Sequence, residues 1–369
     1  MREFIGMGIR SQGGVDKTIG ALILWLLPCL ALAQAPAGPL TPPAQSQAPQ
    51  TLTVPLQEQS QHVAPANGQH QTDAAAKAPQ SQQAPVIRVQ SRLVLVDVTV
   101  KDSSGKVIDG LTAKDFQLTD DGVTQSISYF GRYEMPLAVA LVVDLSASIT
   151  PFLTPLRYAT QTALQTLKAD DEVALFTFST QVQRMVDLTH DKQAVASEIA
   201  SFTTGGKTNI NGGIFDAAVY LERSAPSARR VIILISDDVG TTEGGVSAEK
   251  AEDEVLKAGA SVFNLKVPGE NPAEAKMIAH FILNVRKLAD ETGGEVFDMQ
   301  KQGSLYLAFE ALLDRLKTRY TLGYVPQGVN EEEGRFHTLS VRLVPSGGTP
   351  TRDYHISAPR GYYLQPGAQ

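Results

Sequence analysis

The sequence predicts an α/β fold with a doubly wound, mostly parallel sheet and a small antiparallel β domain built from the segments that flank it. Two runs, Leu137–Val143 and Val231–Ile235, are apolar at every position, which is typical of strands buried on both faces of a parallel sheet. Apolar residues at helical spacing lie between these runs, whereas the flanking segments alternate apolar and polar residues. The pattern indicates an α/β domain inserted into a β domain.

The first flanking segment, residues 86–134, has the period of two that predicts strands. Thr112 and Asp115 have the spacing of a cap on one helical turn. A β segment of this length is marginal alone, so we expect it to pair with another segment. The strand and turn signals are Val94, Val96, Val98 and Val100 on one face, then Asp102–Gly105, Asp120–Gly122 and Ile127–Phe130.

The expected partner is the C-terminal segment, residues 318–365. Leu339, Val341 and Leu343 alternate with polar residues, and Tyr354–Ile356 is a further candidate strand. We therefore predict one antiparallel β domain formed from both ends of the chain. Two separate small β units are the alternative.

The inserted domain, residues 135–317, shows the helical period repeatedly. Its predicted helices carry four apolar stripes: Leu156, Ala159, Ala163 and Leu167; Ile214, Ala217, Ala218 and Leu221; Ile278, Phe281, Ile282, Val285 and Leu288; and Leu305, Phe309, Leu312 and Leu316. Further strands are predicted at Val173–Phe178, Ser261–Val267 and Glu295–Asp298.

The N-terminus has the pattern of a secretory signal peptide over residues 1–33, with basic residues, an apolar stretch from Ile19 to Leu32 and cleavage after Ala33. An uncleaved anchor is the alternative, but the stretch is shorter than the roughly 20 residues of a spanning helix. Residues 34–85 are rich in Ala, Pro and Gln and contain no aromatic residue, which predicts a disordered linker. The single cysteine, Cys29, would leave with the signal.

Oxygen donors follow the two apolar runs. Asp144, Ser146 and Ser148 come directly after the first run and Asp237 follows the second, while Thr208 lies in a Gly-rich loop between them. Carboxylates at the ends of parallel strands lie at the edge where open α/β sheets bind ligands. Carboxylate and hydroxyl oxygens suit Mg²⁺, so these five residues are the predicted metal ligands.

These residues resemble the metal-ion-dependent adhesion site of the von Willebrand factor A domain family, a D-x-S-x-S motif with a distant Thr and a distant Asp. All five positions are filled, and the departure is Asp238, where the family commonly has Gly. Between Val86 and Tyr363 the wider pattern is similar to the secreted bacterial subgroup of VWFA-related Acidobacterial domain proteins.

The resemblance implies a Rossmann-like domain that holds Mg²⁺, or Mn²⁺ or Ca²⁺, mainly through the hydroxyls of Ser146, Ser148 and Thr208, with Asp144 and Asp237 acting partly through water. Few direct charges leave the ion electron-poor, with a position open to an Asp or Glu carboxylate of a partner protein. The alternative is that these loops only cap helices and bind no metal.

Other functions are disfavoured by composition and motifs. The net charge of −7 argues against a nucleic-acid surface. Gly206-Lys207-Thr208 ends like a phosphate-binding loop, but Ser201 stands where that motif needs Gly. The six histidines show no metal-ligand spacing and are expected to be surface or satisfied residues. No G-x-S-x-G hydrolase motif is present.

We therefore predict an exported adhesion or protein-interaction module and not an enzyme, located in the periplasm, cell envelope or outside the cell. After signal cleavage we expect no stable transmembrane segment, and the sequence predicts no particular oligomeric state. The competing class is a phosphatase-like, Mg²⁺-dependent hydrolase on a Rossmann-like sheet. Its general acid would stand two residues after Asp144, where this chain has Ser146.

Overall fold

A computed structural model describes residues 93–132, 135–240, 245–269, 283–330, 332–344 and 354–364. The predicted signal peptide and linker lie outside these residues. Within the described ranges, no helix is both long enough and apolar enough to cross a membrane.

The inserted domain is built on a six-stranded sheet with the order β10-β9-β8-β5-β6-β7. All neighbours in it are parallel except β6 and β7, which are antiparallel. Two of its strands, β5 and β8, contain the two apolar runs. The strands are β5 (Leu137–Asp144), β6 (Glu172–Phe178), β7 (Val182–Thr189), β8 (Arg229–Ser236), β9 (Ser261–Lys266) and β10 (Glu295–Asp298).

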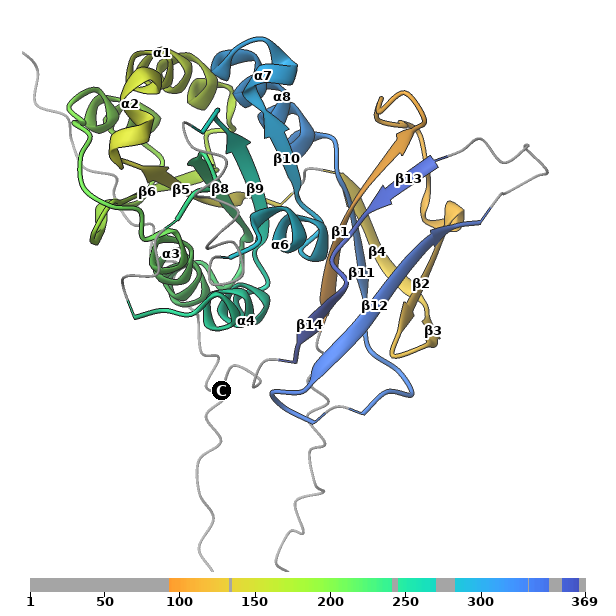
Figure 1. Cartoon of the computed structure of the whole chain (residues 1–369). Coiled ribbons are helices and arrows are strands. Elements are labelled where there is room, and N and C mark those ends of the chain that lie inside the picture. Colours follow the sequence, from red (N-terminus) through yellow and green to blue (C-terminus); the bar gives the residue numbers. More distant parts are fainter. Residues whose placement is uncertain are drawn as a thin grey trace, which may run out of the picture. The chain divides into compact units, whose positions relative to one another are not determined.

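Helices cover both faces of this sheet (Figure 1). They are α1 (Leu153–Ala163), α2 (Lys192–Ala200), α3 (Ile210–Ser224), α4 (Ala248–Ala258), α6 (Val285–Glu291), α7 (Met299–Gln302) and α8 (Leu305–Lys317). Leu141 and Val143 of β5 pack in a core with α1, α2 and α8, whereas Ala140 and Val142 pack in a second core with α3, α4 and α6. Alternate residues of one strand thus serve opposite cores, which is why β5 is apolar throughout. The predicted doubly wound sheet is confirmed.

The predicted helices correspond to α1, α3, α6 and α8, with differences at their ends. The first helix stops at Ala163 and continues as a 3₁₀ turn, Leu164–Thr166, so Leu167 lies beyond it. Ile278, Phe281 and Ile282 of the third stripe lie outside the described residues, and α6 begins at Val285. Sequence analysis missed α2, α4, α7 and the edge strand β7.

The flanking segments form two four-stranded sheets, β13-β1-β11-β4 and β14-β12-β2-β3. Strands of both sheets contribute to one core, including Val96 and Val98 of β1, Leu118 of β2 and Leu322 of β11. The small antiparallel β domain built from flanking segments is therefore present. Its strands are β1 (Val94–Asp102), β2 (Phe116–Asp120), β3 (Val123–Gln125), β4 (Ile127–Arg132), β11 (Tyr320–Tyr324), β12 (Phe336–Leu343), β13 (Tyr354–Ser357) and β14 (Gly361–Tyr363).

Pairing across the two ends of the chain is extensive. Strand β1 is bonded antiparallel to β11 and β13, and β2 is bonded antiparallel to β12. The predicted cap is also present: Thr112 and Asp115 form a capping box on the 3₁₀ turn Ala113–Asp115. The exact domain boundaries, and whether this part folds as a unit, stay predictions.

Candidate metal site

The carboxyl ends of β5 and β8 place the predicted acidic ligands on one edge of the sheet. The two strands are neighbours, with Val143 opposite Ile235. Asp144 is the last residue of β5, and Asp237 directly follows the last residue of β8. Parallel pairing in register brings residues that are far apart in sequence to the same loop cluster.

Asp144 is fully buried and held by two hydrogen bonds. Its Oδ1 accepts from the backbone N–H of Ser146 at 2.8 Å, and its Oδ2 accepts from the hydroxyl of Ser236 at 2.9 Å. Burial raises the pKa of Asp144 from 3.8 to about 6, although both hydrogen-bond partners oppose the rise and the nearby Asp237 adds to it. A buried, partly repelled carboxylate is one that a cation would stabilise.

The hydroxyls of the first loop lie beside these carboxylates. Ser146 Oγ and Ser148 Oγ are 3.1 Å apart. Burial also raises the pKa of Asp237, which is opposed by a backbone bond from Val239 and by the Ser148 hydroxyl. Hydrogen bonds thus connect the two serines with the two carboxylates. The negative charges of Asp144 and Asp237 lie close enough to repel each other.

Thr208 lies on the same edge because its loop is bonded to the first loop. Gly205 N–H donates to the carbonyl of Leu145 at 2.8 Å, and the hydroxyls of Thr204 and Thr150 are 2.7 Å apart. Gly206 has a φ of +84°, and a Cβ there would lie 2.8 Å from Thr180 Oγ1. The backbone conformation and the closeness of Thr180 both favour glycine at this position. Thr208 itself is 8% exposed.

Asp238, the departure from the family pattern, adopts the backbone conformation that glycine would favour. Its φ is +62°, in the left-handed region. Its carboxylate accepts from Asn264 Nδ2 at 2.7 Å and pairs with Lys266 Nζ at 2.8 Å. The negative charge of Asp238 is therefore paired with a lysine of β9. The loop that follows β8 keeps the left-handed conformation at this residue.

The donor set fits a hard divalent cation. Two carboxylates with raised pKa values and a pair of adjoining hydroxyls are oxygen donors of the kind that Mg²⁺ binds. Sequence analysis missed three contributors. Ser236 donates a hydrogen bond to Asp144, and Asn264 and Lys266 each bind the carboxylate of Asp238. Ser236 stands at the end of the apolar run, and its position there was the available signal.

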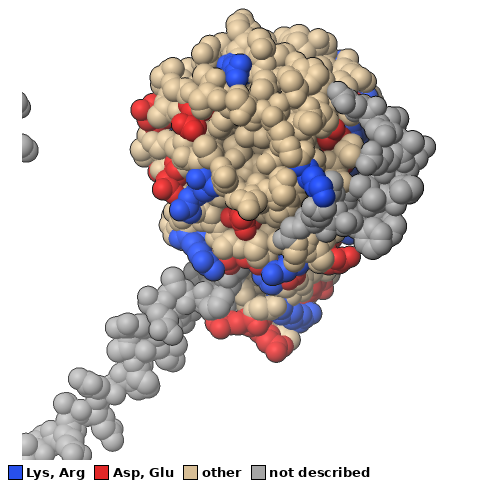
Figure 2. Space-filling model, turned by 60° about the vertical axis from the view of Figure 1, so that its left-hand side comes forward, with Lys and Arg blue, Asp and Glu red and all other residues tan. Residues whose placement is uncertain are grey.

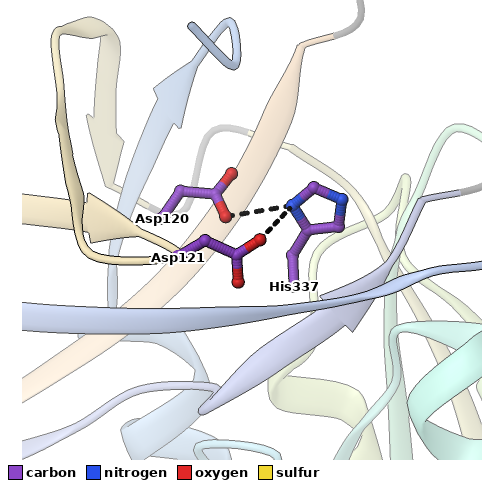
Figure 3. Close-up of side chains that lie close together, drawn as sticks. All are labelled: Asp120, Asp121 and His337. Atoms are coloured by element: carbon purple, nitrogen blue, oxygen red, sulfur yellow. Dashed lines mark hydrogen bonds and ion pairs between the residues drawn. The ribbon is translucent and has the colours of Figure 1, made fainter. Parts of the chain in front are cut away.

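A second group of potential metal ligands lies in the β domain: Asp120, Asp121 and His337 (Figure 3). His337 Nδ1 is 3.1 Å from Asp120 Oδ1 and 3.5 Å from Asp121 Oδ2. Asp120 Oδ2 accepts from the hydroxyls of Tyr324 and Tyr362 at 2.8 and 3.0 Å. The group was missed because His337 is 217 residues from Asp120, a separation that no spacing motif covers.

The charges of this second group favour an ion-pair network over a metal site. Arg335 lies 3.2 Å from Asp121, and Asp120 accepts hydrogen bonds from two tyrosine hydroxyls, so both carboxylates already have partners within the protein. A divalent ion would leave an excess positive charge beside Arg335. In addition, His337 Nε2 is buried and has no hydrogen-bond partner among the described residues, whereas metal-bound histidines usually donate from the second nitrogen.

The fold is an α/β domain in which the loops at one sheet edge bring oxygen-bearing side chains together. Residues 139–240, from within β5 to the loop that follows β8, match the family model of the von Willebrand factor type A domain. Over these residues the chain is therefore similar to von Willebrand factor type A domains. The membership of the Acidobacterial subgroup stays a prediction.

Solved structures with related folds come from several bacteria. An aerotolerance-related membrane protein from Bacteroides fragilis is 17% identical, with 49% of this chain and 98% of that chain covered and a TM-score of 0.39. A von Willebrand factor type A protein from Catenulispora acidiphila is 13% identical, with 74% and 75% covered and a TM-score of 0.42. The vWF domain of the pilus tip protein Mfa5 from Porphyromonas gingivalis is 23% identical, with 29% and 39% covered and a TM-score of 0.27. Comparison with curated proteins gave no match.

Proposed function

We propose that this chain is an exported protein-binding module that uses a divalent metal at the edge of β5 and β8 to recruit an acidic residue of a partner protein. The observation that carries the proposal is the convergence of Asp144, Ser146, Ser148 and Asp237, with both carboxylates raised in pKa by burial. Such a site gains stability when a cation joins it.

The neutral hydroxyls and the charged carboxylates of the site would have different roles. The hydroxyls of Ser146, Ser148 and Thr208 would contact the ion without neutralising it, and Asp144 and Asp237 would anchor it from the two strands. A bound ion, Mg²⁺ or else Mn²⁺ or Ca²⁺, would supply a coordination position for an incoming carboxylate. Because neutral donors leave the ion's charge largely intact, an Asp or Glu of a partner is attracted to it.

The protein surface agrees with a protein partner. The face drawn in Figure 2 intersperses Lys and Arg with Asp and Glu and has no continuous basic field. The pattern of residues 1–33 supports export to the periplasm, cell envelope or exterior. No structural observation favours the phosphatase-like alternative, since Ser146 Oγ stands where a general acid is required and lies 3.1 Å from another hydroxyl.

The first test is direct metal binding. Titration of the chain with Mn²⁺ or Mg²⁺ in a calorimeter is expected to show one saturable site that Asp144→Ala abolishes. The matched control is Asp314→Ala, which removes an exposed aspartate of α8 and is expected to leave the affinity unchanged. Equal affinities in the parent and Asp144→Ala would reject the site.

The second test concerns recognition. A pull-down from native envelope extract is expected to recover a partner with the divalent ion and to lose it with chelator or with Asp237→Ala. Changing one surface Asp or Glu of that partner to Ala should also abolish the complex. Full-affinity binding without metal would overturn the mechanism, and turnover of a phosphate ester that is lost in Asp144→Asn would favour the hydrolase.

A further inference from the structure

A pocket of about 300 Å³ lies beside the candidate metal site, at the carboxyl end of β6. Leu145, the residue that follows Asp144, lines it from the loop after β5. The rest of the lining comes from the end of β6, from the turn between β6 and β7, and from Gln183 near the start of β7. A molecule bound at the metal site therefore has a second surface within reach.

Backbone hydrogen bonds hold this pocket against the loops of the candidate site. The N–H of Leu145 donates to the carbonyl of Phe178 at 2.8 Å, which joins the loop after β5 to the end of β6. The turn between β6 and β7 is bonded to the other loop, because the N–H of Asn209 donates to the carbonyl of Ser179 at 2.8 Å. Asn209 directly follows Thr208. The pocket is thus fixed relative to both loops.

A partner segment would come to the pocket within a residue or two of the metal. Leu145 and Asp144 are consecutive, so their Cα atoms are about 3.8 Å apart. An extended chain advances about 3.3 Å or slightly more for each residue. The side chain that can enter the pocket therefore belongs to a close neighbour of the acidic residue that binds the ion.

The lining of the pocket is polar and uncharged. It presents the hydroxyls of Ser179 and Thr180 and the amides of Gln181 and Gln183, and none of the described residues that line it is acidic or basic. Thr180, Gln181 and Gln183 are exposed and Ser179 is half-buried, so a ligand can contact their polar atoms. Hydroxyl and amide groups both donate and accept hydrogen bonds.

This lining discriminates between the side chains that could enter it. A charged side chain would lose hydration without meeting an opposite charge among the lining residues. An aliphatic side chain would cover the amides of Gln181 and Gln183 without offering them a hydrogen bond. An amide side chain both donates and accepts, so it matches the two glutamines.

We propose that this pocket selects partners in which an Asn or Gln lies within two residues of the acidic residue that binds the metal. The amide of that neighbour would exchange hydrogen bonds with the amides of Gln181 and Gln183. This inference rests on the metal-dependent recruitment proposed above and adds what distinguishes one acidic residue from another. The metal supplies the attraction for a carboxylate, and the pocket supplies the selectivity.

The probes for the test are short synthetic peptides with blocked termini, each with one Asp in a Gly and Ala background and with Asn, Leu or Lys at the neighbouring positions. Binding to the full chain is measured with saturating Mn²⁺ and with chelator. The Asn peptide is expected to bind about fivefold more tightly than the Leu peptide, the factor that one added hydrogen bond of about 1 kcal/mol gives. The Lys peptide should bind no better than the Leu peptide.

Variants of the pocket locate the selectivity. Combining Gln181→Met with Gln183→Met keeps the side-chain lengths but removes both amides, so the Asn and Leu peptides should bind equally while the affinity for Mn²⁺ is unchanged in calorimetry. The matched control is Gln161→Met, at an exposed position of α1 that does not line the pocket, and it should keep the preference for Asn.

A gain of binding provides a test that misfolding cannot imitate. Gln183→Arg places a cation in the pocket, so a peptide with Glu beside its Asp should bind this variant more tightly than it binds the parent chain. The control peptide with Leu beside its Asp should not gain in this way.

The outcomes separate the pocket from the metal site. Mn²⁺-dependent binding with equal affinity for the Asn and Leu peptides, or a preference for Asn that persists in the double variant, would overturn the role of the pocket and leave the recruitment of a carboxylate intact. If no Asp peptide binds in a Mn²⁺-dependent way, the recruitment itself fails and the selectivity with it.

Discussion

The hydroxyl of Ser236 donates a 2.9 Å hydrogen bond to Asp144 Oδ2, joining the ends of β8 and β5. The backbone N–H of Asp238 donates in turn to Ser236 Oγ at 3.1 Å. One serine therefore connects the end of β5 with the loop that follows β8. This bond fixes Asp144 in a buried position, where its charge is costly unless a cation is near.

Replacing Asp144 by Asn should separate metal binding from folding. The rise in the pKa of Asp144 from 3.8 to about 6 corresponds to about 3 kcal/mol of unfavourable free energy for the ionised form at neutral pH. The amide side chain would keep polar contacts to Ser146 and Ser236 without that charge. We expect the metal-free Asp144→Asn variant to be more stable than the metal-free parent, by up to about 3 kcal/mol, in urea unfolding at pH 7.

The same variant should gain nothing from metal. Excess Mn²⁺ is expected to raise the unfolding midpoint of the parent but to leave that of Asp144→Asn unchanged. A parent chain whose midpoint does not respond to Mn²⁺ or Mg²⁺ would contradict the prediction.

Metal affinity should depend on pH through the same carboxylate. Because the folded-state pKa of Asp144 lies above its ordinary value, the protonated form stabilises the metal-free fold below about pH 3.8, and this contribution is lost as the pH rises through about 6. Metal requires the ionised form, so affinity should be about tenfold weaker at pH 5 than on the plateau above pH 7. Calorimetry across this range measures it, and a flat profile would be the contrary outcome.

The elements that sequence analysis predicted well are those in which the pattern of apolar residues reflects which faces are buried. Strand β5 is apolar at consecutive positions because Leu141 and Val142 serve opposite cores. Strand β1 shows its apolar face in Val96, Val98 and Val100, all fully buried. The predicted metal residues could be grouped because the ends of parallel strands share one edge.

The missed elements depend on contacts distant in sequence. In α2, Lys192 is buried because its Nζ donates to the carbonyls of Lys168 and Asp171 at 2.8 and 2.7 Å, contacts that no local pattern records. The edge strand β7 is partly exposed along its length, so its residues lack a clear apolar face. His337 and Asp120 meet only because β12 pairs with β2.

Asp238 should tolerate glycine better than alanine. Both variants lose the bonds to Asn264 and Lys266 that hold the aspartate at its φ of +62°. Alanine has a Cβ, which disfavours this left-handed conformation, whereas glycine has none. We expect Asp238→Gly to be more stable than Asp238→Ala by about 1 kcal/mol in urea unfolding. Both should keep metal affinity within a few fold, since Asp238 pairs with β9. An alanine variant as stable as the glycine variant would contradict this account.

The buried network around Asp120 should contribute to stability and not to metal binding. Asp120→Ala leaves His337 without its nearest carboxylate and removes the acceptor of the Tyr324 and Tyr362 hydroxyls, so unfolding should become easier by about 3 kcal/mol. The control is Asp109→Ala, which removes an exposed pair with Arg132 and should cost about 1 kcal/mol or less. Mn²⁺ stoichiometry should be the same in both variants, and loss of one bound ion in Asp120→Ala would instead identify a second metal site.

Deleting Thr318–Gln369 tests whether the two ends of the chain fold as one domain. The deletion removes β11 and β13, to which β1 is bonded, and β12, to which β2 is bonded. Strands left with unpaired edges exchange rapidly and associate with one another. We therefore expect the amides of Val94–Val98 to lose protection from hydrogen exchange and the truncated chain to aggregate. The amides of β5, which pairs with β6 and β8, should stay protected and serve as the internal control. A soluble truncation with protected Val94–Val98 amides would show that the N-terminal strands fold without the C-terminal segment.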